Sequence, residues 1–223
     1  MTYQNPSFTR EDFQREKEAG WTELIHSGRL FNADVYRLTY GDHTWVVKDF
    51  ADRPFYVRLI ARALLAHEVN VLTRLQGVPG LSRAVFRLDV AALASEFLPG
   101  ISLFNTDPKR ITPDFLRQLE TLTRSMHRAG VVHLDLRSLT NVIMDPEGKP
   151  GIIDFQSAVV TDHLPRFIAR TLRAIDLSGA CKKWQQFQPD VMGAVRRDFF
   201  QKINRIRRWW VFKGYFGLKA KKA

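Results

Sequence analysis

The order of apolar and polar positions along this chain predicts a strand-rich first half and a helix-rich second half. Between Trp21 and Phe50, apolar and polar residues alternate in a pattern that predicts three strands. Residues 54–75 place their apolar side chains at helical spacing instead. The other predicted elements are strands at 85–88 and 91–98, a helix from Asp114 to about Arg128, a hairpin of 141–144 with 151–153, and helices over 165–184 and 196–208. This order predicts the α+β class.

Signals that start and stop these elements divide the chain into four predicted regions. Thr9 favours the start of a short helix that Gly20 ends, in a charged segment that we expect to be solvated. Pro99 and Gly100 stop the last strand of the predicted sheet. The regions are a charged leader at 1–20, a sheet-containing part at 21–98, a mostly helical part at 99–190, and a basic aromatic C-terminal segment at 191–223.

The candidate chemistry lies around the predicted hairpin. His133-Leu134-Asp135 precedes it, Asn141 begins it, and Asp154 follows its second strand. Phosphoryl transfer needs a carboxylate that orients the attacking hydroxyl and oxygen ligands that hold magnesium on the phosphates. Asp135 suits the first task, and Asn141 and Asp154 suit the second. The alternative is that these side chains only cap the turns beside a hairpin.

These residues resemble the protein-kinase-like superfamily, whose catalytic loop reads H-R-D-L-x-x-x-N and whose metal motif reads D-F-G. The resemblance covers about residues 25–180. It implies a two-lobed fold, with a small antiparallel-sheet N-lobe at 21–98 and a reduced, mostly helical C-lobe. Two departures are visible: residues 137–140 make the loop one residue longer than in the family, and Gln156 replaces the glycine.

No long activation segment and no A-P-E motif follow Gln156. Their absence favours the compact, atypical branch of the superfamily. Within it, the chain resembles the bacterial lipopolysaccharide (Kdo/heptose-type) core kinases and the RIO-like kinases.

The resemblance implies ATP and Mg²⁺ as cofactors and assigns nucleotide-binding roles to several residues. Lys48, at the end of an apolar strand, would bind the phosphates and pair with Glu68. Gly28 is the glycine that remains of the G-x-G-x-x-G-x-V loop, and the backbone at Glu96 and Leu98 would bind adenine. A solvated edge lysine and an ordinary surface glutamate are the alternatives for Lys48 and Glu68.

Three more residues receive roles from the same resemblance. Arg137 would offset charge on the transferring phosphoryl group, as a lysine does in the family. Asp176 would brace the catalytic loop, unless it is an ordinary surface carboxylate. For His133, a buried backbone contact is favoured over a role as base or metal ligand.

Composition adds an anionic partner to these expectations. The net charge of +11 suits nucleic acid, an acidic membrane surface or a phosphorylated substrate. The single cysteine, Cys181, fits a reducing compartment, and the N-terminus has no apolar core of a secretory signal. No apolar run reaches the length of about 18 residues that a transmembrane helix needs. A cytoplasmic location is therefore expected.

The C-terminal segment combines cations with aromatic residues, including Trp209 and Trp210. This combination suits an anionic bilayer surface, which would place the protein on the inner face of the cytoplasmic membrane. A helix packed on the C-lobe is nearly as well supported, and RNA binding is the weakest alternative.

The sequence thus predicts an ATP- and Mg²⁺-dependent phosphotransferase that acts on a sugar hydroxyl of a membrane glycolipid such as lipopolysaccharide core. Two alternatives remain: a RIO-like serine/threonine protein kinase and a pseudokinase scaffold.

Overall fold

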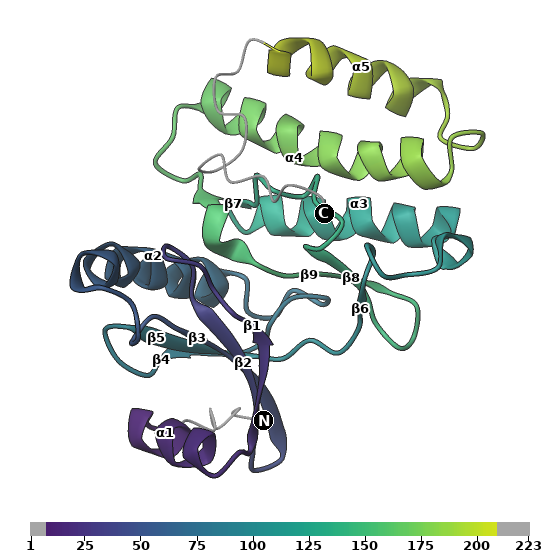
Figure 1. Ribbon diagram of the computed structural model, residues 1–223. Helices are drawn as coiled ribbons and strands as arrows, with labels where there is room; N and C mark the ends of the chain where they lie inside the picture. The colour runs from purple at the N-terminus through teal and green to yellow at the C-terminus, as the bar shows by residue number, and fades with distance from the viewer. Residues whose placement is uncertain (1–7, 209–223) are drawn as a thin grey trace.

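The computed structural model describes residues 8–208 and has an α+β fold, as the sequence predicts. Its N-terminal part is built on a five-stranded antiparallel sheet with the order β1-β2-β3-β5-β4, seen at the lower left of Figure 1. The strands are β1 (Thr22–His26), β2 (Asp34–Tyr40), β3 (His43–Asp49), β4 (Val85–Arg87) and β5 (Ala92–Glu96). The predicted strands are therefore present, with ends shifted by one or two residues.

A helix covers each face of this sheet because side chains alternate along the strands. Trp45 and Val47 of β3 pack toward α1 (Arg10–Glu18), which contributes the buried Phe13. Lys48 lies on the opposite face, toward α2 (Phe55–Arg74), as does Leu93, its register partner in β5. The position of Lys48 on the α2 side is what brings it to Glu68.

The described residues of the charged leader are only partly solvated: their polar side chains are exposed or half-buried, but two aromatic residues are buried. Thr9 caps α1 in a capping box with Asp12, as its sequence position predicts. Phe8 and Phe13, however, are 3% and 0% exposed and pack against the sheet. Because the segment is mostly polar, its composition did not indicate that these two aromatic side chains join α1 to the core.

The C-terminal part stacks three helices, α3 (Pro113–Arg128), α4 (Arg166–Phe187) and α5 (Ala194–Arg208), as Figure 1 shows. Arg196 of α5 forms an ion pair with Glu120 of α3 at 2.6 Å. The residues beyond Arg208, including the predicted aromatic and basic tail, lie outside the described part.

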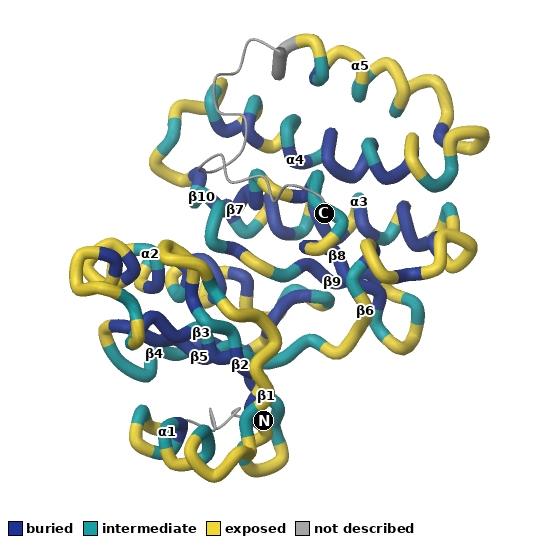
Figure 2. The backbone as a smooth tube through the Cα atoms, viewed as in Figure 1, coloured by how far each residue is buried: buried dark blue, intermediate teal, exposed yellow. Residues whose placement is uncertain are grey.

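Two small sheets lie between these helices and the N-terminal part. The predicted hairpin is formed by β8 (Val142–Met144) and β9 (Pro150–Ile152), and β6 (Ile101–Ser102) pairs with β8. A second sheet, which the sequence did not predict, joins β7 (Val131–Val132) to β10 (Val159–Val160). Figure 2 shows the largely buried interior on which these elements meet. Within residues 8–208, no helix is both long and apolar enough to cross a bilayer.

Candidate active site

A cleft of about 840 Å³ lies where the five-stranded sheet meets the C-terminal part. It collects side chains from strands, a helix and loops that are far apart in the sequence. Six of the predicted site residues line it: Lys48, Glu68, Glu96, Leu98, Asn141 and Asp154. Asp135 borders the cleft through Asn141, to which it is hydrogen-bonded.

Lys48 is held between two carboxylates in this cleft. Its Nζ lies 2.6 Å from Glu68 Oε1 and 3.0 Å from Asp154 Oδ1. Burial alone would lower the pKa of Lys48, but the charges of Glu68 and Asp154 outweigh it and raise that pKa above its ordinary value. The charge of Lys48 in turn holds the pKa of Asp154 below its usual range. Lys48 is therefore a fixed cation, and neither it nor Glu68 is an ordinary surface residue.

Asp135 and Asn141, the candidates on the predicted catalytic loop, form a second group that is joined by direct hydrogen bonds. The Asn141 amide donates to Asp135 Oδ2 at 2.9 Å, while Asn141 Oδ1 accepts from the Thr140 hydroxyl at 3.1 Å. Burial raises the pKa of Asp135, although His133 and Asn141 partly oppose this shift. A carboxylate whose pKa is raised, at the edge of an open cleft, suits proton transfer or the positioning of a hydroxyl.

The donor set of this group fits magnesium. Asn141 and Asp154 offer a carbonyl oxygen and a carboxylate to the same cleft. Magnesium is commonly held by one or two carboxylates together with phosphate oxygens and water. No group of three or more His, Cys, Asp or Glu side chains within residues 8–208 is placed to hold a metal. Phosphate oxygens of a bound nucleotide, together with water, would supply the remaining ligands.

Asp176 of α4 braces the backbone that presents Asp135. Its carboxylate accepts hydrogen bonds from the N–H groups of His133 and Leu134, at 2.6 and 2.7 Å. It also lies 3.1 Å from Nε2 of His127 in α3, and it is 1% exposed. Leu134 has a φ of 65°, a strained conformation that these bonds stabilise. Asp176 is therefore not the surface carboxylate that the sequence left open.

His133 makes the buried backbone contact that the sequence favoured. It is 0% exposed, and its Nε2 lies 3.0 Å from the carbonyl of Ile153. Its ring also packs edge-on against Phe155. His133 thereby connects the loop that carries Asp135 to Ile153, the residue before Asp154. Asp154 itself has a φ of 65°.

Two lysines of α4, which sequence reasoning missed, hold the carbonyl groups of the longer loop. Lys183 Nζ donates to the carbonyls of Leu136 and Ser138, and Lys182 donates to that of Arg137. Burial, helped by the nearby charge of Lys182, lowers the pKa of Lys183 to about 7. A signal was available: Asp176 and Lys183 are seven residues apart and therefore share one face of the helix.

The two predicted adenine-binding positions lie side by side on the cleft wall. The carbonyl of Glu96 accepts from the Ser82 hydroxyl at 3.3 Å, and the Glu96 carboxylate accepts from the Arg83 N–H. Among the hydrogen bonds formed within residues 8–208, none uses the N–H or C=O of Leu98. Leu98 thus keeps one donor and one acceptor for a ligand in the cleft.

Two predicted residues are placed elsewhere. The N–H of Gly28 donates to Asp34 at 2.8 Å, and its carbonyl accepts from Arg53, so both groups are used within the loop. A Cβ at this position would lie 2.2 Å from the Ala33 carbonyl oxygen, which gives the glycine a packing reason. Neither Gly28 nor Arg137 is among the residues that line the cleft.

Arg137 turns toward the C-terminal helices. Its guanidinium donates to Ser178 of α4 at 3.3 Å and lies 5.4 Å from the ring centre of Phe200 in α5. These contacts direct the Arg137 side chain toward α4 and α5, and its role on a phosphoryl group stays a prediction.

In chemical terms, the cleft contains a fixed cation and two metal-compatible oxygen ligands, and a carboxylate of raised pKa, Asp135, lies at its border. No protein-family model matches the chain, and no curated protein matches it. Its chemistry is therefore judged from the geometry of these side chains.

Proposed function

We propose that the protein is an ATP- and Mg²⁺-dependent phosphotransferase with a two-lobed, protein-kinase-like fold. The observation that carries this proposal is the convergence of Lys48, Glu68, Asn141 and Asp154 on one cleft. A cation poised between carboxylates is suited to a polyphosphate, whose oxygens would take over part of its coordination.

Each residue has a defined task in the proposed reaction. The oxygen of the acceptor hydroxyl bonds to the γ-phosphorus, and the bond from the γ-phosphorus to the ADP oxygen breaks. Asp135 accepts the proton that this hydroxyl loses. Lys48 holds the nucleotide phosphates, and Glu68 orients Lys48. Asn141 and Asp154 would hold magnesium, which supplies charge neutralisation on the phosphates when bound.

The base of the nucleotide would bind to the strand end at Glu96–Leu98. Adenine presents an amino donor beside a ring-nitrogen acceptor. The Leu98 N–H and C=O, which have no partner within residues 8–208, are complementary to such an edge. The Glu96 carbonyl, with a 3.3 Å hydrogen bond from Ser82, has a second lone pair to offer.

For the acceptor we propose a sugar hydroxyl of a membrane glycolipid such as lipopolysaccharide core. The support is the resemblance to lipopolysaccharide core kinases together with the net charge of +11, which suits an anionic surface. The protein would then work at the inner face of the cytoplasmic membrane, with its C-terminal segment as one contact. Nucleic acid is not the partner that we propose.

The first experiment is label transfer from γ-labelled ATP in a membrane extract, followed by separation of lipid from protein. We expect label in the lipid fraction with the wild type and none with Asp135→Asn. Label in protein would favour a RIO-like serine/threonine kinase. No label, from a protein that remains folded, would favour a scaffold, for which the internally bonded N–H of Gly28 is the supporting observation.

A further inference from the structure

Two exposed groups of arginines and apolar side chains lie outside the cleft and have no role in the proposed reaction. They belong to the N-terminal halves of α2 and α4 and are together called here the arginine–aromatic face. Its members are Phe55, Tyr56, Arg58, Leu59, Ile60, Arg62, Arg166, Phe167 and Arg170.

The apolar members of this face are not needed for the core. Val57, Ala61 and Leu65 are the residues of α2 that pack onto the sheet at helical spacing. Phe55 and Leu59 point the other way and are 75% and 70% exposed, so they leave large apolar groups in water. On α4, Phe167 is 72% exposed in the same manner.

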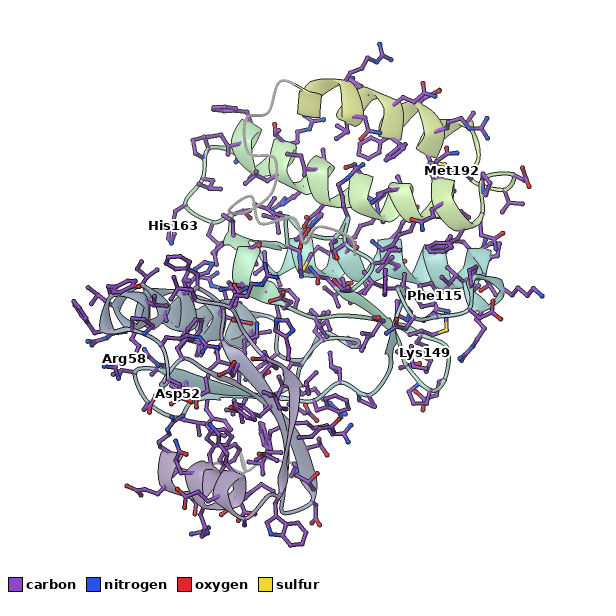
Figure 3. The ribbon with its side chains drawn as sticks, viewed as in Figure 1. Asp52, Arg58, Phe115, Lys149, His163 and Met192 are labelled. Carbon is purple, nitrogen blue, oxygen red and sulfur yellow. The ribbon has the colours of Figure 1, made fainter. Side chains whose placement is uncertain are left out.

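Both helix starts lie toward one side of the molecule. In Figure 3, Arg58 and His163, which precedes α4, are on the left, whereas Met192 and Lys149 are on the right. In Figure 2 the outer surface at the left end of α2 is exposed. Because α5 runs back along α4, it also ends on the left (Figure 1).

The charge of this face has a single sign. No Asp or Glu occurs between Phe55 and His67, and none occurs between Arg166 and Ile175. The four guanidinium groups, at Arg58, Arg62, Arg166 and Arg170, form no ion pair within residues 8–208. The acids that flank these segments in the chain have other partners. Asp52 lies near Lys17 and Glu68 pairs with Lys48, while Asp162 pairs with Arg74 and Asp176 lies beside His127.

The α4 portion of the face also borders a hollow of about 640 Å³. Arg166, Arg170 and Arg173 line it together with Leu164 and Phe199 of α5. A hollow with three arginines can receive an anionic group such as a phosphate, which arginine binds through two N–H donors. The only acidic lining residue is Asp162, which pairs with Arg74.

We propose that the arginine–aromatic face binds the surface of an anionic phospholipid bilayer. Its arginines would contact headgroup phosphates while the aromatic and aliphatic side chains enter the interfacial region. Charge complementarity favours this partner, because the arginines of the face form no ion pair within residues 8–208 and an anionic bilayer presents negatively charged headgroups over its whole surface. Membrane contact is then carried by the folded body and not by the C-terminal segment alone.

The test is sedimentation of the full-length protein with vesicles, in the absence of ATP. Vesicles of phosphatidylcholine alone are compared with vesicles that also contain phosphatidylglycerol. The test variant carries Arg58→Gln, Arg62→Gln and Arg166→Gln. The matched control removes three exposed cations elsewhere with Lys109→Gln, Arg110→Gln and Lys149→Gln.

We expect the wild type and the control to sediment with the anionic vesicles only. Three arginines at about 1 kcal/mol each correspond to binding about 100-fold weaker in the test variant. A second variant, with Phe55→Ser, Leu59→Ser and Phe167→Ser, should also bind less, whereas Phe104→Ser, at a 70% exposed control position, should not. All of these sites are exposed, so the melting temperatures should agree.

Three results would overturn the proposal. The first is a wild type that does not bind anionic vesicles, and the second is equal binding by the test and control variants. The third is a wild-type dimer that the face variants convert to monomers, since a second copy of the chain would then cover the face. Because no ATP is present, each result is independent of whether phosphotransfer occurs.

Discussion

At the scale of single residues, the pKa values of Asp154 and Asp135 shift in opposite directions because the surroundings of the two carboxylates differ. Asp154 lies beside a cation that lowers its pKa and keeps it charged. Asp135 forms no ion pair within residues 8–208, and burial raises its pKa. One carboxylate is thus suited to metal binding and the other to accepting a proton.

Replacement of Asp135 by asparagine should lower phosphotransfer by a factor of about 10² to 10⁴, because the proton acceptor is lost while its shape is kept. Binding of Mg²⁺–ATP should persist, since Asp135 is not among the residues that line the cleft. The measurements are single-turnover label transfer and the rise in melting temperature that Mg²⁺–ATP causes. Loss of both in the variant would mean that Asp135 serves binding and not catalysis.

The buried Lys183 predicts a specific dependence of stability on pH. Its pKa is about 7 in the folded protein and 10.5 in a model peptide. Between these values the unfolded chain binds more protons, so the contribution of Lys183 to the free energy of unfolding rises with pH. We expect the difference in stability between wild type and Lys183→Met to increase over this range in denaturant titrations. A flat difference would contradict the assignment, and Lys202→Met, at an exposed site, is the control.

At the scale of elements, α4 acts as the support of the catalytic-loop candidate. Asp176 holds the N–H groups at the start of the loop, and Lys182 and Lys183 hold carbonyls farther along it. The additional loop residue relative to the kinase pattern is thus accommodated by donors from one helix. The loop and α4 should therefore unfold together.

Replacing Asp176 by asparagine should destabilise the protein by about 2–4 kcal/mol, because two buried N–H groups lose a charged acceptor. The exposed Asp190, replaced in the same way, should change stability by less than about 0.5 kcal/mol. Chemical denaturation measures both. Equal effects at the two positions would show that the brace contributes little.

The sequence predicted the elements well where periodicity and caps are strong. Thr9, Thr112 and Gly20 delimit α1 and α3 as expected. It could not reveal that Phe8 and Phe13 are buried, since two apolar residues in a charged segment carry no clear period. The pairing of β7 with β10 was also missed, because each strand is only two residues long.

Within the candidate site, the sequence predicted the contact between two residues whose side-chain directions are fixed by their positions in a strand and a helix. Lys48 pairs with Glu68 because strand alternation and helix spacing fix the directions of those two side chains, whereas the contact of Lys48 with Asp154 was not predicted. The contacts of Gly28 with Asp34 and of Arg137 with Phe200 were not predicted, because they depend on tertiary packing that no local pattern encodes.

At the scale of the whole molecule, the cleft depends on contact between the N-terminal sheet and the C-terminal part. The ion pair of Lys48 with Asp154 crosses this junction, and so does the bond from His67 to the Ala158 carbonyl. A nucleotide that engages Lys48 and the metal ligands would add further links between the two parts.

Lys48→Met should therefore abolish the stabilisation by Mg²⁺–ATP. For the wild type, that stabilisation is about 2.7 kcal/mol at a ligand concentration 100 times its Kd. The variant should also be less stable without ligand, because Glu68, which is 4% exposed, loses its partner. Thermal unfolding with and without nucleotide provides both values, and Lys149→Met, at an exposed position, is the control. An undiminished shift in Lys48→Met would place the nucleotide elsewhere.

The short connection from Asp154 to α4 has a consequence for regulation. Residues 155–165 contain a 3₁₀ turn and β10, and Thr161 is hydrogen-bonded to Gly130 at both its N–H and its hydroxyl. This segment is too short, and too much of it is hydrogen-bonded, to move between two positions in response to a covalent modification. The reaction should start without a lag, and preincubation with ATP should not change its rate. The rate of the proposed phosphotransfer would then follow the supply of acceptor.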